Sequence, residues 1–160
     1  MGFEYTILEN GLDFVLTAVK DLLSIDENAP DSKANKRHIK YSLLHLSSGI
    51  ELVLKYRLLQ EHWTYVFSDM NKAASEKLKS GNFESAGIFT IIERLETFCD
   101  IKLKGDKKKR GNGKAEILTD LRKKRNRIEH FSLIDDSSIM IELIHNCITI
   151  LIEVILEYYE

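Results

Sequence analysis

The sequence has few of the residues that build sheets, disulfide frameworks or metal sites. Its 160 residues include one proline and two cysteines. Alternation of Val, Ile or Thr with polar residues is nearly absent, which argues against half-buried strands and for helices. No Cys-x-x-Cys or His-Glu-x-x-His spacing occurs, so nothing in the sequence supports a metal site. The Gly111-Asn112-Gly113 segment follows no predicted strand and is a weak signal for a phosphate loop. We therefore expect neither a metal nor another cofactor.

Signals for export or membrane insertion are equally scarce. Cys99 and Cys147 lie in apolar helical surroundings, as is typical of buried thiols in a reducing compartment. Residues 1–4 carry an acid where a signal peptide would carry basic residues. The longest apolar tract, residues 147–156, is interrupted by a Thr and a Glu and is shorter than the ~20 residues of a membrane-spanning helix. We expect a cytoplasmic protein without membrane contact.

The overall charge is small, but its distribution is uneven. The formal net charge is −2, so no global field draws nucleic acid to the protein. Residues 102–127 nevertheless contain twelve Lys and Arg against three acids, while residues 133–160 contain six acids and no Lys or Arg. A basic block of this kind either binds phosphates or forms a solvated loop.

Apolar residues recur at helical spacing through most of the chain. The expected helices cover residues 5–24, 34–66, 71–79, 83–98, 114–130 and 138–158. Small residues at 47–49 would allow another helix to approach closely or the helix to bend slightly. Glu93 and Arg94 are expected to face solvent. The last helix is apolar on nearly every side and must be surrounded. The length and pattern predict one all-α domain over residues 1–160, an up-and-down bundle of four to five main helices.

The groups best suited to handling a phosphate are concentrated at the end of the fifth predicted helix. Arg125 can hold a phosphate with two donors, Asn126 can orient a polar ligand, and His130 can exchange a proton near neutral pH. On an ideal helix, Arg125 and His130 lie roughly 140° apart. Arg125 is at the edge of the apolar stripe of Ile117, Leu118, Leu121, Ile128 and Phe131, and His130 points nearly opposite. Either the helix breaks near His130 or a second copy of the chain completes the site.

Ordinary surface roles would also account for these residues. Arg125 and Glu129 are four residues apart and would then form a surface ion pair. Basic residues at the end of a helix also suit the negative pole of its dipole. Chemistry alone leaves both interpretations open.

The pattern Arg125-Asn126-Arg127-Ile128-Glu129-His130, at the end of a helix in a small all-helical chain, resembles the HEPN superfamily. The signature of that superfamily is an Arg, four to six residues of which the first is polar, and a His; here four residues intervene. The resemblance implies a HEPN-like helical bundle, a homodimer and, in many members, metal-independent ribonuclease activity. Other members lack activity.

The resemblance further implies an endoribonuclease of the toxin–antitoxin or phage-defence type. The ribose 2′-OH would attack the neighbouring phosphate and leave a 2′,3′-cyclic phosphate, with Arg125, Asn126 and His130 as catalytic residues. The residues expected to bind RNA are Lys107, Lys108, Lys109, Arg110, Arg122 and Arg127. An antitoxin of the nucleotidyltransferase type is the implied protein partner. The alternatives are a non-catalytic helical dimerisation or binding module and a nucleotide-binding regulator.

Overall fold

The structure is a computed structural model that describes residues 4–105 and 113–159, and within these ranges it is all-α, as predicted. Five helices have eleven or more residues: α1 (Ile7–Leu23), α2 (Lys33–Glu61), α4 (Ile88–Phe98), α5 (Lys114–His130) and α6 (Ser137–Tyr159). The shorter elements are η1 (Trp63–Val66), η2 (Met70–Lys72) and α3 (Ser75–Ser80). The five long helices agree with the four to five main helices expected from the sequence.

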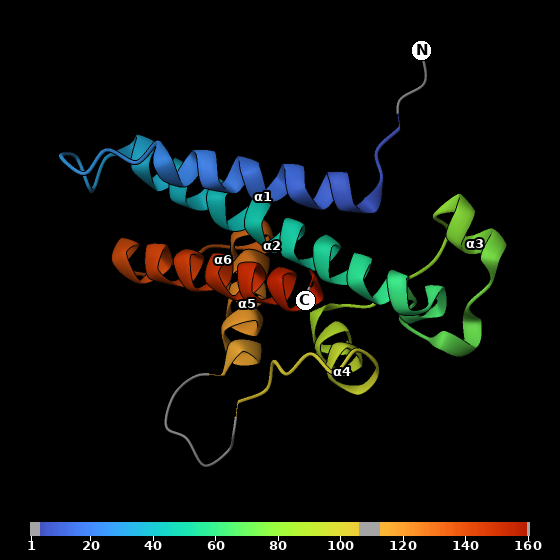
Figure 1. The fold of residues 1–160 in the computed structure, drawn as a ribbon. Helices are drawn as coiled ribbons and strands as arrows, with labels where there is room; N and C mark the ends of the chain where they lie inside the picture. The colour runs from blue at the N-terminus through green and yellow to red at the C-terminus, as the bar shows by residue number, and fades with distance from the viewer. Residues whose placement is uncertain (1–3, 106–112, 160) are drawn as a thin grey trace.

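Helix α2 occupies the centre of the arrangement. α1, η1, α4, α5 and α6 all contact it (Figure 1). Figure 1 shows α1, α2 and α6 running along one another, whereas α5 passes behind α6 and crosses it. The predicted up-and-down arrangement therefore does not describe α5, because its apolar stripe packs across α2 and α6.

The hairpin of α1 and α2 begins and turns at polar caps. Thr6 accepts a hydrogen bond from the Glu9 backbone nitrogen at 3.2 Å, and the Glu9 carboxylate accepts one from the Thr6 nitrogen at 3.0 Å. In the connecting loop, the buried Asn35 side chain donates to the Asp26 and Ala29 carbonyls at 2.7 and 3.0 Å. The buried Asn35 amide thereby provides hydrogen-bond partners for two backbone carbonyls of the turn before α2.

The two helices of this hairpin touch where glycines face each other. A methyl group at Gly49 would lie 2.8 Å from the Gly11 carbonyl oxygen and 2.9 Å from the Val15 backbone nitrogen. The small residues at 47–49 thus serve the close helix approach that the sequence offered as one of two possibilities. Nearby, the Asp21 carboxylate faces both His38 and His45, each at 3.3 Å through Nδ1.

The segment between α2 and α4 departs from the predicted boundaries. Helix α2 ends at Glu61 and η1 follows, because His62 takes an extended conformation. Helix α4 begins at Ile88 rather than at 83, because residues 66–68 and 84–86 form a short antiparallel contact: the Ser68 nitrogen donates to the Glu84 carbonyl at 2.8 Å. A backbone already paired in an extended conformation cannot join the helix.

The expectation that Arg94 faces solvent is wrong. Glu93 is exposed as predicted, but Arg94 is buried, and its guanidinium donates to the backbone carbonyls of Tyr65, Phe67 and Ser68. Burial lowers the pKa of Arg94 from its ordinary value, yet three carbonyl acceptors satisfy its donors. Arg94 therefore anchors the segment around η1 to α4.

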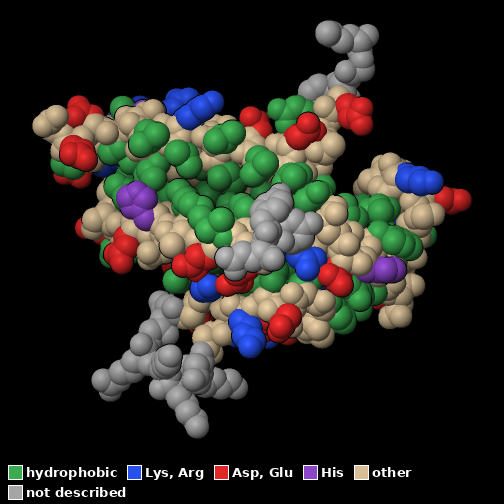
Figure 2. Space-filling model, in the orientation of Figure 1, with side chains coloured by type: hydrophobic (Ala, Val, Ile, Leu, Met, Phe, Trp, Pro, Cys, Tyr) green, Lys and Arg blue, Asp and Glu red, His purple; other side chains and the backbone are tan. Residues whose placement is uncertain are grey.

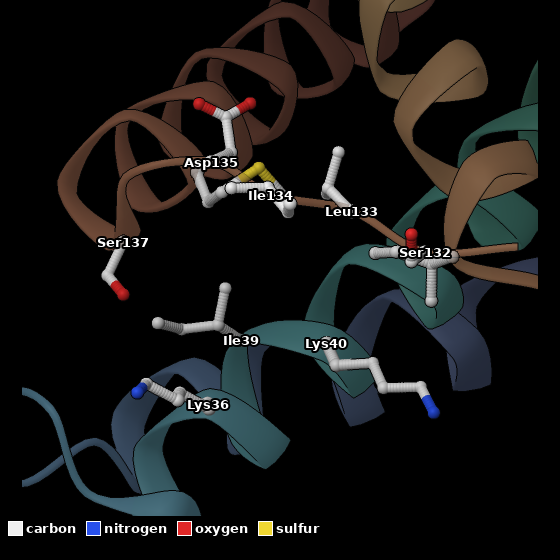
Figure 3. A pocket seen from close by; sticks show the side chains of 10 residues that line it. Lys36, Ile39, Lys40, Ser132, Leu133, Ile134, Asp135 and Ser137 are labelled. Carbon is white, nitrogen blue, oxygen red and sulfur yellow. The ribbon is translucent and has the colours of Figure 1, made fainter.

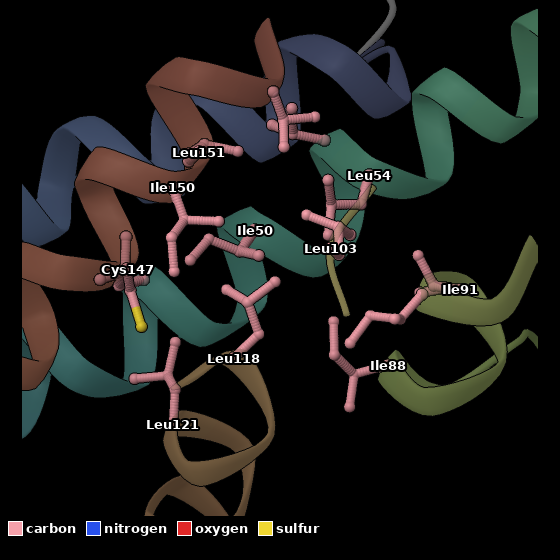
Figure 4. Close-up of a cluster of buried hydrophobic side chains, with 14 of the residues drawn as sticks. Ile50, Leu54, Ile88, Ile91, Leu103, Leu118, Leu121, Cys147, Ile150 and Leu151 are labelled. Carbon is pink, nitrogen blue, oxygen red and sulfur yellow. The ribbon is translucent and has the colours of Figure 1, made fainter. Parts of the chain in front are cut away.

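The hydrophobic core lies where α2, α4, α5 and α6 meet (Figure 4). The side chains labelled there are Ile50, Leu54, Ile88, Ile91, Leu103, Leu118, Leu121, Cys147, Ile150 and Leu151. Burial raises the pKa of the Cys147 thiol to about 12. Cys147 is thus a buried free thiol, as expected, while Cys99 is only half-buried.

Helix α6 buries one side and leaves apolar side chains on another. Leu12 and Leu16 of α1, together with Ile152 and Leu156 of α6, are exposed. Figure 2 shows hydrophobic side chains gathered over α1 and between α1 and α6. By length and composition, Ser137–Glu157 could cross a membrane, and 39% of the tested stretch is buried inside the structure. The expectation that this region is too short for a bilayer rested on residues 147–156 and understated the apolar length.

We predict that Gly49→Ala destabilises the protein. Alanine normally stabilises a helix interior by up to ~1 kcal/mol relative to glycine. Here the added methyl group would meet the α1 backbone, so we expect the free energy of unfolding to fall by about 1–3 kcal/mol. Urea denaturation measures this change. Gly87→Ala is the matched control, because a methyl group added there would have no atom within 4 Å and a change below ~1 kcal/mol is expected. A stabilised Gly49→Ala protein would contradict the close contact.

Candidate functional site

The candidate site is the C-terminal end of α5. The first half of this helix is held in the core by Leu118 and Leu121, which are both buried. Its last turn carries Arg127 and His130, basic residue types that suit the negative end of the helix dipole. The helix ends at His130, and its cap is Phe131, whose backbone nitrogen still donates to the Arg127 carbonyl at 2.9 Å. The chain thus leaves the helix next to His130, as one of the two sequence-based possibilities had it, but Arg125 and His130 both lie within the helix.

Arg125 is held by its own helix. Its Nη1 lies 2.8 Å from the Glu129 carboxylate and donates to the Asn126 side-chain oxygen at 3.1 Å. Its Nε is buried and has no hydrogen-bond partner among the described residues. The ion pair expected from an ordinary surface role is thus present, and the buried Nε donor of Arg125 is left unsatisfied by the described residues.

His130 lies on the solvent side of the same Glu129 carboxylate. Its side chain is 77% exposed, and its Nε2 lies 4.0 Å from the Glu129 carboxylate, beyond hydrogen-bond distance. Within the described part of the chain, Glu129 is consequently the one side chain in ion-pair contact with both Arg125 and His130. Sequence reasoning recognised the Glu129 pairing with Arg125 from its spacing but not its proximity to His130.

The segment Arg125–His130 is called the motif from here on. Around it are large apolar side chains that are exposed to solvent. Phe131 was expected on the apolar stripe of the helix but is 89% exposed, because its backbone leaves the helical conformation at φ −152° and ψ −107°. Ile134 in the following connection is 91% exposed, and Ile139 in the first turn of α6 is 51% exposed. These three exposed large hydrophobic residues all lie within nine positions of His130 and are here called the motif patch.

The predicted RNA-binding residues are spread over both ends of α5. Arg122 pairs with Glu51 of α2 at 3.1 Å, whereas Arg127 is exposed in the last turn. Lys107, Lys108, Lys109 and Arg110 lie outside the described residues. The residues that flank this stretch, Gly105 and Gly113, adjoin each other at the N-terminal end of α5. The motif lies at the other end, about 24 Å away along the helix axis.

The described part of the chain contains no group of three His, Cys, Asp or Glu side chains placed to hold a metal ion. Comparisons with protein-family models, with curated proteins and with solved structures find no match to this chain. The site is therefore interpreted from its own residues.

We predict that Glu129→Gln increases the affinity of the protein for phosphate-containing ligands. The Glu129 carboxylate would compete with a bound phosphate for Arg125, and an i,i+4 ion pair of this kind is worth about 0.3–0.5 kcal/mol. Its removal should strengthen binding about twofold. Fluorescence anisotropy with a labelled 2′-O-methyl RNA strand, which has no free 2′-hydroxyl, measures the effect. Glu142→Gln on α6 removes the same charge from an exposed position and is the control. Equal effects of the two variants would mean that only net charge matters.

Proposed function

We propose that this protein is a homodimeric, metal-independent endoribonuclease similar to HEPN ribonucleases. The observation that carries the proposal is the arrangement at the end of α5, where a partly buried arginine and an exposed histidine lie five residues apart on one unbroken helix. Phosphoryl transfer combines charge stabilisation with proton transfer, and these two side chains supply both functions.

The carboxylate between Arg125 and His130 favours a site shared between two copies. Within one chain, the same Glu129 oxygen lies 2.8 Å from Arg125 Nη1 and 4.0 Å from His130 Nε2, so a negative charge occupies the space where a phosphate would bind to both. A two-fold axis beside the motif would place the Arg125 of one copy near the His130 of the other. The motif patch of Phe131, Ile134 and Ile139 offers apolar surface for that contact.

The proposed reaction needs no group beyond RNA and the protein. His130 accepts the proton of the ribose 2′-OH as its oxygen attacks the adjacent phosphorus. Arg125 stabilises the charge that grows on the phosphoryl oxygens, and Asn126 positions the ribose or phosphate. The bond to the 5′-oxygen breaks, and that oxygen takes a proton. The products are a 2′,3′-cyclic phosphate and a 5′-hydroxyl.

The proposed setting is a cytoplasmic toxin–antitoxin or phage-defence system, with an antitoxin of the nucleotidyltransferase type as protein partner. The stretch Lys107–Arg110, with Arg122 and Arg127, would hold the RNA backbone. A second candidate function is a non-catalytic dimerisation module. The Arg125–Glu129 ion pair favours it, because a paired arginine is also what an ordinary helix end would contain.

We predict cleavage of RNA in excess EDTA, because the proposed chemistry uses only side chains. Purified protein incubated with total RNA should yield fragments that end in 2′,3′-cyclic phosphate, identified by mass spectrometry. His130→Ala should lower the cleavage rate by about 10²–10⁴-fold, the usual contribution of a general acid or base. Because this side chain is 77% exposed, the variant should fold normally. Cleavage that stops with EDTA and returns with magnesium would contradict the proposal.

We predict that two inactive variants restore activity together if the site is composite. Arg125→Ala and His130→Ala homodimers should each be inactive while their circular dichroism stays unchanged. A heterodimer purified through two different tags keeps one intact Arg125 and, on the other chain, one intact His130. One composite site then survives, and about half of the wild-type activity should return. A heterodimer as inactive as its parents would show that each chain uses its own pair.

A substitution in the motif patch tests the shared site independently. Phe131→Asp should separate the copies in analytical ultracentrifugation and abolish cleavage, since charge at an exposed apolar contact opposes association. Phe89→Asp on α4 also changes an exposed phenylalanine and should affect neither property. Full activity of a monomeric Phe131→Asp protein would contradict the shared site.

A further inference from the structure

A groove lies directly beside the motif, between the first turns of α2 and the connection from α5 to α6 (Figure 3). Its volume is about 480 Å³, within the range of ~300–1,000 Å³ that is usual for ligand sites. Ile39, Ile128, Leu133 and Met140 give it apolar walls. Ile128 lies between Asn126 and His130 in the motif, so the groove adjoins the segment that carries the proposed catalytic residues.

One rim of the groove is positively charged. Lys36 and Lys40 are one helical turn apart on α2 and line the groove together. Both are exposed, and the ion pairs of the described residues include neither of them. The Lys40 ammonium lies over the ring of the adjacent Tyr41, 5.4 Å from its centre. Two lysines without carboxylate partners among the described residues favour an anionic ligand on this rim.

The opposite rim is polar, and the negative charge on it is balanced by a neighbouring lysine. Ser132 and Ser137 provide hydroxyl groups, and Asp135 provides a carboxylate. Asp135 forms an ion pair with Lys124, and the hydrogen bond from that lysine keeps the pKa of Asp135 below its ordinary value. The carboxylate charge is therefore matched within this rim, and the charge of Lys36 and Lys40 remains for a ligand.

The positions of the two lysines also indicate how a bound ligand would be oriented in the groove. In Figure 3 their ammonium groups turn toward opposite ends of the groove, with Ile39 between them. A nucleotide inside a nucleic-acid strand has this distribution, with an apolar-faced base between two phosphates. A base in a duplex would first have to lose its pairing and stacking to enter the groove, so an unpaired strand fits the geometry at a lower cost.

We infer that this groove binds one unpaired nucleotide of a single-stranded RNA, with its base against the apolar wall and its two flanking phosphates on Lys36 and Lys40. The identity of the ligand as RNA rests on the proposed function, while the site itself rests on the groove and its charges. The bound nucleotide would lie next to the cleaved phosphate and would position the strand.

The test is the binding of a 2′-O-methyl single strand, which the proposed reaction cannot cleave, to the full-length protein. Lys36→Ala/Lys40→Ala should weaken binding about 25-fold at 0.1 M salt, because two phosphate contacts on a single strand release ~0.7 counterion each. The slope of log affinity against log salt should become shallower by about 1.4. Wild-type protein should bind an abasic strand about fivefold or more weakly than the normal strand.

The matched control is Lys77→Ala/Lys79→Ala on α3, which removes two exposed lysines near the other end of α2. It should change neither the affinity nor the salt slope. Equal losses in both double variants, or equal binding of the abasic strand and the normal strand, would overturn the groove assignment. A Lys36→Ala/Lys40→Ala protein that binds RNA normally but sediments as a monomer would overturn it in favour of a second copy of the chain in the groove.

Binding and cleavage separate the two proposals. Within a His130→Ala background, Lys36→Ala/Lys40→Ala should weaken binding of the uncleavable strand by the same factor as in the wild-type background, because His130 does not line the groove. If no RNA is cleaved but Lys36→Ala/Lys40→Ala loses strand binding, the ribonuclease proposal fails and the groove stands. If RNA is cleaved and this variant binds normally, the groove assignment alone fails.

Discussion

The structure depends on the burial of α2. Five other elements pack against this helix, and its buried positions include polar as well as apolar residues. Several of these polar groups are tolerated because they have partners: the Ser42 hydroxyl donates to the Ala18 carbonyl at 2.9 Å, and the buried Lys55 ammonium contacts Glu51 at 2.7 Å and Ser85 at 2.9 Å. An unpaired charge there would cost several kcal/mol. The glycine contact with α1 and these polar pairs together set where the other helices can lie.

The position of α5 across α2 explains the form of the candidate site. Leu118 and Leu121 bury the first half of the helix, and Arg122 pairs with Glu51. The last turn therefore extends to the surface as a rigid end, with Arg125 partly covered and His130 in solvent. The Arg125–Glu129 pair that occupies this end in one chain is an i,i+4 pair worth only ~0.3–0.5 kcal/mol. A phosphate bound with two hydrogen bonds could replace it, so the ion pair and the proposed catalytic role of Arg125 are compatible.

The motif patch and the groove beside the motif share Ile134. The patch residues are apolar, whereas the groove combines an apolar wall with the charges of Lys36 and Lys40, which pair with no carboxylate among the described residues. Gly105 and Gly113, the described residues on either side of the stretch that contains Lys107–Arg110, lie at the other end of α5.

Local sequence patterns were enough to predict the all-α class and the ranges of α1, α5 and α6 to within two residues, because hydrophobic periodicity is a local property. They left two possibilities for the small residues at 47–49, and the contact at Gly49 is the close approach. It also located the Arg125–Glu129 pair from spacing alone. Local patterns could not predict the burial of Arg94, the exposure of Phe131 or the crossing of α5. Each of these depends on backbone groups from distant segments or on where a helix ends. The groove lined by Lys36 and Lys40 could not be predicted from local patterns either. Lys36 and Ile128 are ninety-two positions apart in the sequence, and they line one groove only because α5 and α6 pack against α2.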